Sequence, residues 1–321
     1  MSDRPVLLCP FAEAAIHPDA EAMARRSLEW VREHKLLPDE SSSSIEKVHS
    51  YSLLAARCYP SAPFARLAAI CDYISWLFLF DDICEGLSLD GASPGEVSAF
   101  LTGIFGVLWG APGPGPASAR FVEALGDIWE RIGPLCSETW RNRLIRHVEN
   151  YIDGCTWEAQ NRTLRRVPSR AVFQQMRLFT STMYEFWDFI EYAGGFCLPD
   201  EVVEHPIVAE LSRTANAVAS YANDIYSLRK EAENRDFHNL VVVIEHEERI
   251  GRPAAYARAA AIHDVQARHY LALEPLVPSF GPEVDRPLGR YMEGMRIWMR
   301  ANYDWSCVTI RYNAAPQARP G

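Results

Sequence analysis

Two groups of oxygen-bearing side chains are spaced so that a helix would turn each of them into a site for a hard cation. In the first, an apolar stretch that begins at Trp76 ends in Asp81 and Asp82, with Glu85 one turn further on. Asp81 and Glu85 are four residues apart, and like charges at that spacing repel unless a cation lies between them. Magnesium prefers such oxygen ligands and leaves room for phosphate oxygens. A solvated acidic helix end would show the same letters, so this group alone leaves both interpretations open.

The second group is Asn223, Ser227 and Glu231, which follow one another at intervals of four residues. Each such step turns a helix by about 400°, so the three side chains share one face. An amide oxygen, a hydroxyl and a carboxylate on one face form a second site for a hard cation. The long side chain of Glu231 can reach back, because Cα–Cβ bonds tilt toward the helix N-terminus. The alternative is an amphipathic helix with its polar residues outward.

The elements that must position these groups are helices. Apolar residues recur with a helical period along most of the chain, and there is no convincing alternating strand pattern or Gly-rich βαβ turn. Clusters of Pro and Gly separate the periodic segments. We predict an all-α fold with helices over residues 19–35, 43–58, 63–84, 94–108, 117–132, 137–158, 170–192, 201–231, 236–249, 252–274 and 283–306.

Composition narrows the function classes. Hydrophobic residues make up 48% of the chain, enough for a large core, and the net charge is −10. A nucleic-acid or anionic-membrane surface would need a basic excess, so neither partner is expected. An acidic protein can still bind a phosphate ester if divalent metals reverse the local field. No repeat or shift in composition divides the chain, which predicts one domain over residues 1–321 with a disordered tail at 314–321.

The sequence predicts a cytoplasmic protein without membrane insertion. Residues 1–11 lack a basic segment followed by an apolar one, and the longest apolar run, residues 73–80, is far too short to span a bilayer. The eight cysteines are spread along the chain with no CxxC pair. That distribution is typical of reduced, mostly buried thiols.

Taken together, the two oxygen-rich groups resemble the metal-binding motifs of class I terpene synthases. Asp81-Asp82-Ile-Cys-Glu85 is similar to their aspartate-rich motif, and Asn223-Asp224-x-x-Ser227-x-x-x-Glu231 is similar to their NSE triad. The resemblance covers nearly the whole chain. It implies a single-domain class I terpenoid synthase (isoprenoid synthase) fold, a helical bundle around a deep central cavity. The metal-binding residues that it implies are Asp81, Asp82, Glu85, Asn223, Ser227 and Glu231.

The resemblance also implies an activity. Members of this family use Mg²⁺, about three ions per site, to ionise an isoprenyl diphosphate, and the carbocation then cyclises in a dry cavity. Chain length and family type favour farnesyl diphosphate as the substrate and a sesquiterpene hydrocarbon or alcohol as the product. A homodimer is common in the family, although nothing in this sequence argues for one.

Basic side chains that would bind the diphosphate follow from the same resemblance. Arg177 lies 46 residues before Asn223, which is the spacing of the family's pyrophosphate-sensing Arg, and a guanidinium binds phosphate bidentately without losing its charge. Thr180 and Ser181 stand at the linker and effector positions, where the helix breaks and a backbone carbonyl points into the cavity. The effector is often Gly, so Ser181 departs from the pattern. Lys230 matches a phosphate-binding Lys, although an exposed helix cation fits the same letter.

The C-terminal stretch from Trp305 to Arg311 and Tyr312 resembles the family's Trp…Arg-Tyr signature. There the Arg and Tyr donate hydrogen bonds to the diphosphate in the closed enzyme, and the Arg pairs with the residue equivalent to Asp82. Phe78 and Trp305 are candidates for lining the cavity, because each aromatic face stabilises a cation by about 0.5–2 kcal/mol. Either could equally be an ordinary core aromatic.

Three alternatives remain open. One is a diterpene cyclase that acts on geranylgeranyl diphosphate. The second is an isoprenyl-diphosphate chain-elongating synthase, a family that normally carries two aspartate-rich motifs where this chain has one motif and a triad. The third is a non-catalytic helical binding protein. A class II cyclase would need a DxDD motif, which the sequence lacks.

Overall fold

Polar side chains begin several of the helices. Ser41, Ser137 and Ser169 each accept a hydrogen bond from a backbone N–H in the first turn of the helix that follows, and Asn239 does the same. Ser93 forms a reciprocal capping box with the third residue of its helix. Such caps satisfy N–H groups that have no partner within the helix, and each contributes about 1 kcal/mol.

The computed structural model describes residues 4–13, 15–89, 91–111, 119–233 and 236–313, without the side chains of residues 85 and 87–89. Within these ranges the chain forms helices and no strand, and the predicted tail at 314–321 lies outside them. Three short 3₁₀ turns accompany the α-helices. The α-helices are α1 (Ala20–Glu33), α2 (Ser42–Cys58), α3 (Phe64–Leu89), α4 (Pro94–Phe105), α5 (Ala119–Ile132), α6 (Glu138–Leu164), α7 (Arg170–Thr180), α8 (Met183–Gly194), α9 (Asp200–Val203), α10 (Pro206–Glu233), α11 (Leu240–Glu248), α12 (Arg252–Leu273), α13 (Pro282–Val308) and α14 (Ile310–Asn313).

Five predicted helices were wrong in their boundaries. Two of them are longer than predicted, since α3 continues to Leu89 and α6 to Leu164. The segment 170–192 is interrupted between α7 and α8, where Thr182 has a left-handed φ of 58°. The segment 201–231 divides into α9 and α10, because Pro206 starts a new helix and disfavours helical geometry in the residue before it. The segment 236–249 becomes helical only at α11, since the backbone of its cap, Asn239, is extended.

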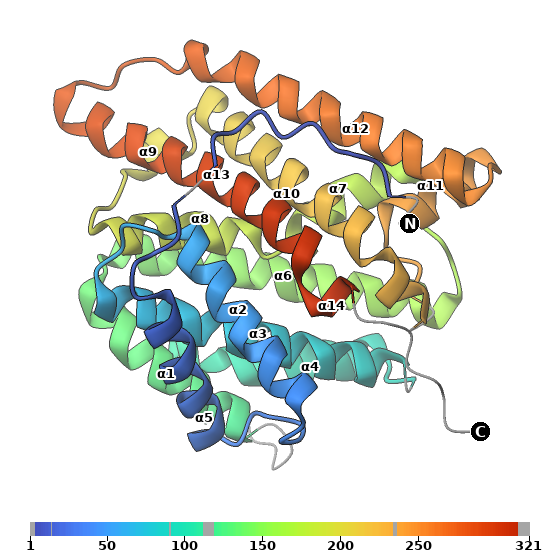
Figure 1. Ribbon diagram of the computed structural model, residues 1–321, viewed down its shortest axis with the longest axis horizontal. Coiled ribbons are helices and arrows are strands. Elements are labelled where there is room, and N and C mark those ends of the chain that lie inside the picture. Colours follow the sequence, from blue (N-terminus) through green and yellow to red (C-terminus); the bar gives the residue numbers. More distant parts are fainter. Residues whose placement is uncertain (1–3, 14, 90, 112–118, 234–235, 314–321) are drawn as a thin grey trace.

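The helices pack around α3 and α10 (Figure 1). Residues 67–80 of α3 are almost all buried, as expected for a helix that is apolar on every side. Helix α3 packs against α1, α2 and α5, while α10 packs against α12 and α13. The two oxygen-rich groups predicted from the sequence therefore lie on helices of the interior. In the described ranges no helix combines the length and apolar character needed to cross a membrane.

A buried ion cluster fixes α6 against α8. Arg143 is almost fully buried, and it donates to Asp188 from Nε at 2.9 Å and to Glu191 from NH2 at 2.5 Å. Removing one member of such a cluster leaves an uncompensated charge in the interior. On the cavity side, Gly154 of α6 lets α7 approach closely, because a Cβ there would lie 2.7 Å from Cγ2 of Thr180.

All eight cysteines are free thiols. Six of them are buried or half-buried, and Cys197 and Cys307 are exposed. The prediction of mostly buried thiols is therefore confirmed for three positions, and three more are half-buried.

Candidate active site

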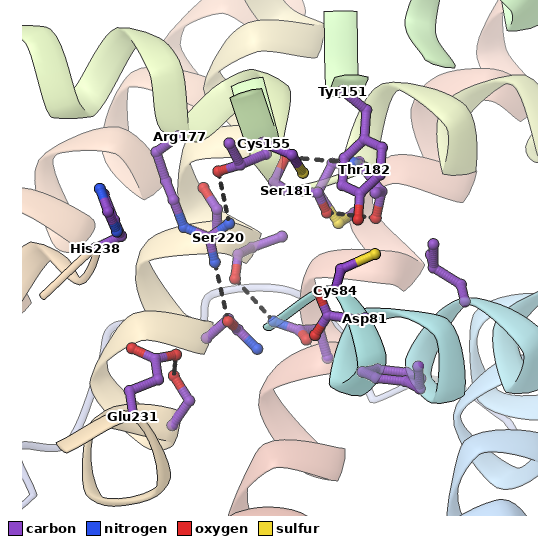
Figure 2. A pocket seen from close by; sticks show the side chains of 18 of the residues that line it. Asp81, Cys84, Tyr151, Cys155, Arg177, Ser181, Thr182, Ser220, Glu231 and His238 are labelled. Atoms are coloured by element: carbon purple, nitrogen blue, oxygen red, sulfur yellow. Dashed lines mark hydrogen bonds between the residues drawn. The ribbon is translucent and has the colours of Figure 1, made fainter. Parts of the chain in front are cut away.

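A cavity opens between α3, α6, α7, α8, α10 and the C-terminal helices α13 and α14. Figure 2 shows Asp81 of α3 and Glu231 of α10 on opposite sides of it, with Arg177 of α7 directed between them. Charged and polar side chains gather in the part of the cavity around these three residues. The apolar part is lined by Leu54, Leu77, Phe78, Met183, Phe186, Trp298 and Trp305.

The two aspartates of α3 have different environments. The side chain of Asp81 is 51% exposed and lines the cavity. Asp82 instead receives both guanidinium nitrogens of Arg311, at 2.8 and 3.0 Å, and its Oδ1 lies 3.3 Å from Nζ of Lys230. Burial alone would raise the pKa of Asp82, but these cations hold it well below its usual range. Both oxygens of Asp82 are thus engaged by cations of the protein, and its role as a metal ligand stays a prediction. The side chain of Glu85 lies outside the described residues.

On α10, Asn223, Ser227 and Glu231 lie along the cavity. The hydroxyl of Ser227 donates to Oε1 of Glu231 at 2.5 Å. Asn239, which caps α11, donates to Oε2 at 2.7 Å. Burial disfavours the charged form of Glu231 and raises its pKa to about 8, and the neighbouring Asp224 adds to the effect. A carboxylate in this setting is well suited to a cation partner.

Arg177 is held rigidly beside this triad. Its Nε donates to Oδ1 of the buried Asp224 at 2.8 Å, and its NH2 donates to Oδ1 of Asn223 at 3.0 Å. Burial works against the charged guanidinium, but the carboxylate of Asp224 outweighs it, so the pKa of Arg177 lies above its ordinary value. Asp224 also accepts a hydrogen bond from the backbone N–H of Leu240 at 3.0 Å. Asp224 therefore sets the orientation of Arg177.

The helix is interrupted where the resemblance placed the linker and effector. Thr180 ends α7, Ser181 follows it, and both line the cavity. The hydroxyl of Ser181 contacts Oδ1 of Asn216 at 2.8 Å and accepts from the N–H of Met183 at 3.2 Å. The backbone oxygen of Ser181 accepts from the hydroxyl of Thr182 at 2.6 Å. These bonds offset the left-handed backbone conformation of Thr182, which costs a non-glycine residue about 1–3 kcal/mol.

Helix α14 brings two further donors to the cavity. Arg311 is buried and pairs with Asp82, and its NH2 also lies 3.4 Å from Oδ2 of Asp81. The hydroxyl of Tyr312 accepts a hydrogen bond from Nδ2 of Asn223 at 2.7 Å. Both residues line the cavity, as does Lys230. The C-terminal Arg-Tyr pair thereby bridges the acidic end of α3 and the triad on α10.

Aromatic rings surround Arg311. Its Cζ lies 5.0 Å from the ring centre of Phe78 and 5.8 Å from that of Tyr51, and these two rings stack 4.4 Å apart. The ring centre of Trp305 lies 5.6 Å from that of Phe78, and Nε1 of Trp305 donates to the backbone oxygen of Ser50 at 2.9 Å. Phe78 and Trp305 both line the cavity. A guanidinium enclosed by rings gains cation–π attraction, which is stronger where water is excluded.

Several contributors to the site were not predicted. Tyr51, Asp224 and Asn239 are buried and act through hydrogen bonds to Arg311, Arg177 and Glu231 respectively. Asp224 stands inside the triad motif, so its position was an available signal, and the stretch from Asp236 to Asn239 resembles the family with an expected structural role. The positions of Tyr51 and Asn239 are not spaced with either motif. The other polar residues that line the cavity without having been predicted are Cys84, Tyr151, Cys155, Glu158, Arg162, Thr182, Ser220, Asp236, His238 and Asn302.

Tyr51 is expected to be a positioning residue. Burial raises its pKa to about 12, so the hydroxyl stays protonated while its oxygen accepts from NH1 of Arg311 at 2.9 Å. In Tyr51→Phe the buried guanidinium loses that acceptor, and we expect kcat/KM to fall about tenfold, since a charged hydrogen bond contributes about 1.5–3 kcal/mol. The matched control is Tyr270→Phe, which removes a buried hydroxyl that donates to the backbone oxygen of Met292 at 3.1 Å. Equal steady-state kinetics for the two variants would contradict this role.

The donor set fits a hard divalent cation. Asp81 offers a half-exposed carboxylate on one side of the cavity, and Asn223, Ser227 and Glu231 offer an amide oxygen, a hydroxyl and a carboxylate on the other. Among the side chains that the structure describes, no three His, Cys, Asp or Glu residues form a metal cluster by themselves. The neutral oxygens of Asn223 and Ser227 are suitable donors beside the carboxylates, and a Mg²⁺ bound by few carboxylates keeps coordination positions for diphosphate oxygens.

Comparisons with known proteins agree with this geometry. The family model "Terpene synthase family 2, C-terminal metal binding" matches residues 72–268. The 10-epi-cubebol synthase of Sorangium cellulosum (strain So ce56) is 64% identical over 98% of this chain and 99% of that protein. The (+)-T-muurolol synthase ((2E,6E)-farnesyl diphosphate cyclizing) of Roseiflexus castenholzii is 33% identical over 95% and 93%.

Solved structures give the same result for the fold. The crystal structure of germacradien-4-ol synthase from Streptomyces citricolor superimposes with a TM-score of 0.82 at 26% identity, covering 95% of this chain and 99% of that one. The predicted all-α terpenoid synthase fold is confirmed. By sequence, fold and the residues that line its cavity, this chain belongs to terpene synthase family 2, whose C-terminal part binds metal.

Proposed function

We propose that this protein is a Mg²⁺-dependent class I terpene cyclase that ionises farnesyl diphosphate, releases diphosphate and cyclises the carbocation to a sesquiterpene. One observation carries the proposal. Asp81 and the triad of Asn223, Ser227 and Glu231 lie on two sides of a single cavity, which also has a part lined by apolar and aromatic side chains. Metal ligands and a dry chamber are the two things that ionisation and cation control require.

The residues of the chain divide the reaction between them. Bound Mg²⁺ would supply Lewis acidity to the leaving diphosphate, with Asp81 and Glu85 on one side and the α10 triad on the other as ligands. Four donors would bind the diphosphate oxygens as the allylic C–O bond breaks and its electron pair leaves with the oxygen. These donors are Arg177, Lys230, Arg311 and Tyr312.

The apolar part of the cavity then holds the cation. Phe186 stacks on Trp298 with ring centres 4.5 Å apart, and both face the cavity together with Phe78 and Trp305. Ring faces exclude water and stabilise positive charge by about 0.5–2 kcal/mol each. We assign Thr180 and Ser181 to the break in the helix, as the linker and the effector, and Arg177 as the residue that senses the diphosphate.

Relatives support a C15 substrate. The Roseiflexus protein is named for cyclising farnesyl diphosphate, and the more similar Sorangium protein for forming 10-epi-cubebol. Both product names denote alcohols, so we propose that this chain also ends its reaction by water capture. Asn302 supports that choice, since it lines the cavity and its Nδ2 donates to the backbone oxygen of Ala219 at 3.0 Å, which leaves the amide oxygen to accept from a water.

Incubation with geranyl, farnesyl and geranylgeranyl diphosphates tests the proposal, with products identified by mass spectrometry. We expect turnover of the C15 substrate in Mg²⁺, a cyclic sesquiterpene alcohol as the main product, and none after chelation. A C20 hydrocarbon or alcohol would favour the diterpene cyclase, and a longer prenyl diphosphate would favour the chain-elongating synthase.

Ligand-induced stabilisation tests the binding site independently of turnover. A ligand that binds only the native state at about 100 times its Kd adds about 2.7 kcal/mol to the free energy of unfolding. We expect Mg²⁺ and pyrophosphate together to raise the thermal midpoint, and either alone to have little effect. Absence of both synergy and turnover would identify the non-catalytic helical binding protein.

We further propose a single domain over residues 1–321 and a cytoplasmic location. The relatives quoted above support the first, since they match over nearly their whole lengths. The homodimer that the family allows is a hypothesis for sedimentation analysis, where a monomer would remove it.

A further inference from the structure

We propose that Arg4, in the N-terminal segment, is a positioning residue for the C-terminal Arg311-Tyr312 pair and so completes the active site from outside. The proposal rests on the proposed function, because it assigns Arg4 a role in binding the diphosphate. Arg4 belongs to neither motif, and it lies 307 residues before Arg311 in the sequence.

The first observation is the contact itself. NH1 of Arg4 donates to Oδ1 of Asn313 at 2.7 Å, and NH2 donates to the backbone oxygen of Tyr312 at 2.9 Å. The guanidinium also lies 5.5 Å from the ring centre of Tyr226 on α10. A planar guanidinium with two parallel donors suits a pair of acceptors on consecutive residues. Arg4 thus holds the last two described residues of the chain and touches the helix that carries the triad.

The second observation is the weakness of α14 without such contacts. It has four residues, Ile310–Asn313, and a helix of one turn has no stability of its own in water. Nδ2 of Asn313 donates to the backbone oxygens of Ser306 and Thr309 at 3.2 and 2.8 Å. Arg4 therefore bonds to a side chain that also bonds to the backbone at the end of α13. These contacts together fix the backbone that carries Arg311.

The third observation is that the N-terminal segment is fastened along its course. The backbone N–H of Leu8 donates to Asp264 of α12 at 2.9 Å. The ring of Phe11 packs edge-on against Tyr270 at 5.7 Å, and its backbone oxygen accepts from Arg300 of α13 at 3.3 Å. Figure 1 shows this segment, in dark blue, running along α12 and α13 toward the end of the molecule where α11 lies.

These anchors limit where Arg4 can go. It lies four positions before Leu8, whose N–H is fixed, and an extended chain spans at most about 3.6 Å per residue. Arg4 therefore acts from a defined place and does not search a large volume for its acceptors. Inside the protein, Arg311 is held by Asp82 and Tyr51, and outside it, the same short helix is held by Arg4.

The test compares Arg4→Ala and Arg4→Lys with a matched control, Arg290→Ala. Arg290 makes the same kinds of contact away from the cavity, since its NH2 donates to the backbone oxygen of Gly194 at 2.8 Å and its guanidinium lies 4.8 Å from the ring of Phe196. Two readouts are needed. One is hydrogen exchange at the amides of Tyr312 and Asn313, which both bond to the oxygen of Thr309, and the other is kcat/KM with farnesyl diphosphate.

In Arg4→Ala we expect exchange at these amides to accelerate about tenfold and kcat/KM to fall about tenfold, chiefly through KM, because one charged hydrogen-bond pair is lost. Arg4→Lys is expected to recover part of both, since Lys keeps the charge but reaches one acceptor at a time. Arg290→Ala should leave both readouts at the wild-type values.

The outcomes separate the proposal from the proposed function. Unchanged exchange in Arg4→Ala would overturn the contact, and faster exchange with unchanged kcat/KM would overturn the positioning role. A wild-type protein that turns over no prenyl diphosphate and shows no synergy of Mg²⁺ with pyrophosphate would overturn the proposed function, and with it the positioning role. Faster exchange in Arg4→Ala would then still establish the contact.

Discussion

Glu231→Gln is expected to lower kcat/KM with farnesyl diphosphate by a factor of about a thousand or more, while the protein stays folded. The variant keeps the shape of the side chain and removes its charge. A glutamine oxygen can still accept from Asn239, and its nitrogen can donate to the hydroxyl of Ser227. The protein-side hydrogen bonds are thus conserved, and what is lost is a metal ligand and the charge stabilisation that it supports, for which about 4 kcal/mol is a typical cost.

Two measurements isolate that effect. The thermal midpoint without ligands should not fall in Glu231→Gln, because burial already disfavours the charged carboxylate, whereas the joint stabilisation by Mg²⁺ and pyrophosphate should disappear.

The matched control is Glu185→Gln. Glu185 is also fully buried, accepts a hydrogen bond from the hydroxyl of Tyr73, and has its pKa raised to about 8 by burial. It does not line the cavity, so the synergy should persist in that variant. Retained synergy and turnover in Glu231→Gln would remove Glu231 from the metal site.

Arg177→Ala is expected to abolish turnover and also to destabilise the protein by about 3–5 kcal/mol, because it leaves the buried carboxylate of Asp224 without its cation. Activity and stability would then fall together, and loss of activity alone could not be assigned to diphosphate binding. A second substitution separates the two.

Asp224→Asn in the Arg177→Ala background removes the stranded charge. The double variant should recover a large part of the free energy of unfolding, measured by urea denaturation, since the stability effects of substitutions at contacting residues are not additive. It should remain inactive, because no guanidinium faces the diphosphate. If turnover returned with stability, Arg177 would serve only to neutralise Asp224.

Local regularities explain what the sequence could predict about the site. Asn223, Ser227 and Glu231 share a face because an α-helix repeats every 3.6 residues, whatever surrounds it. The apolar run that ends at Asp81 marks a buried helix with a polar end for a similar reason. These inferences needed only helical geometry and the chemistry of oxygen ligands.

Contacts between distant segments could not be read in that way. The adjacent residues Asp81 and Asp82 look equivalent as letters, yet Asp81 faces the cavity while Arg311, 229 residues further on, takes both oxygens of Asp82. Tyr51 and Asn239 follow no spacing shared with the motifs that they support. The hydrogen bond from Ser181 to Asn216, beside the break at Thr182, joins two helices.

The sequence by itself therefore determined the all-α class, the helices that carry the two oxygen-rich groups, and the family to which those groups belong, because each is encoded in spacings of a few residues. Only the tertiary structure decided which aspartate faces the cavity, which buried groups orient Arg177, Arg311 and Glu231, and how residue 4 comes to hold residues 312 and 313. Those choices depend on distances across the bundle, which packing sets and no local pattern records.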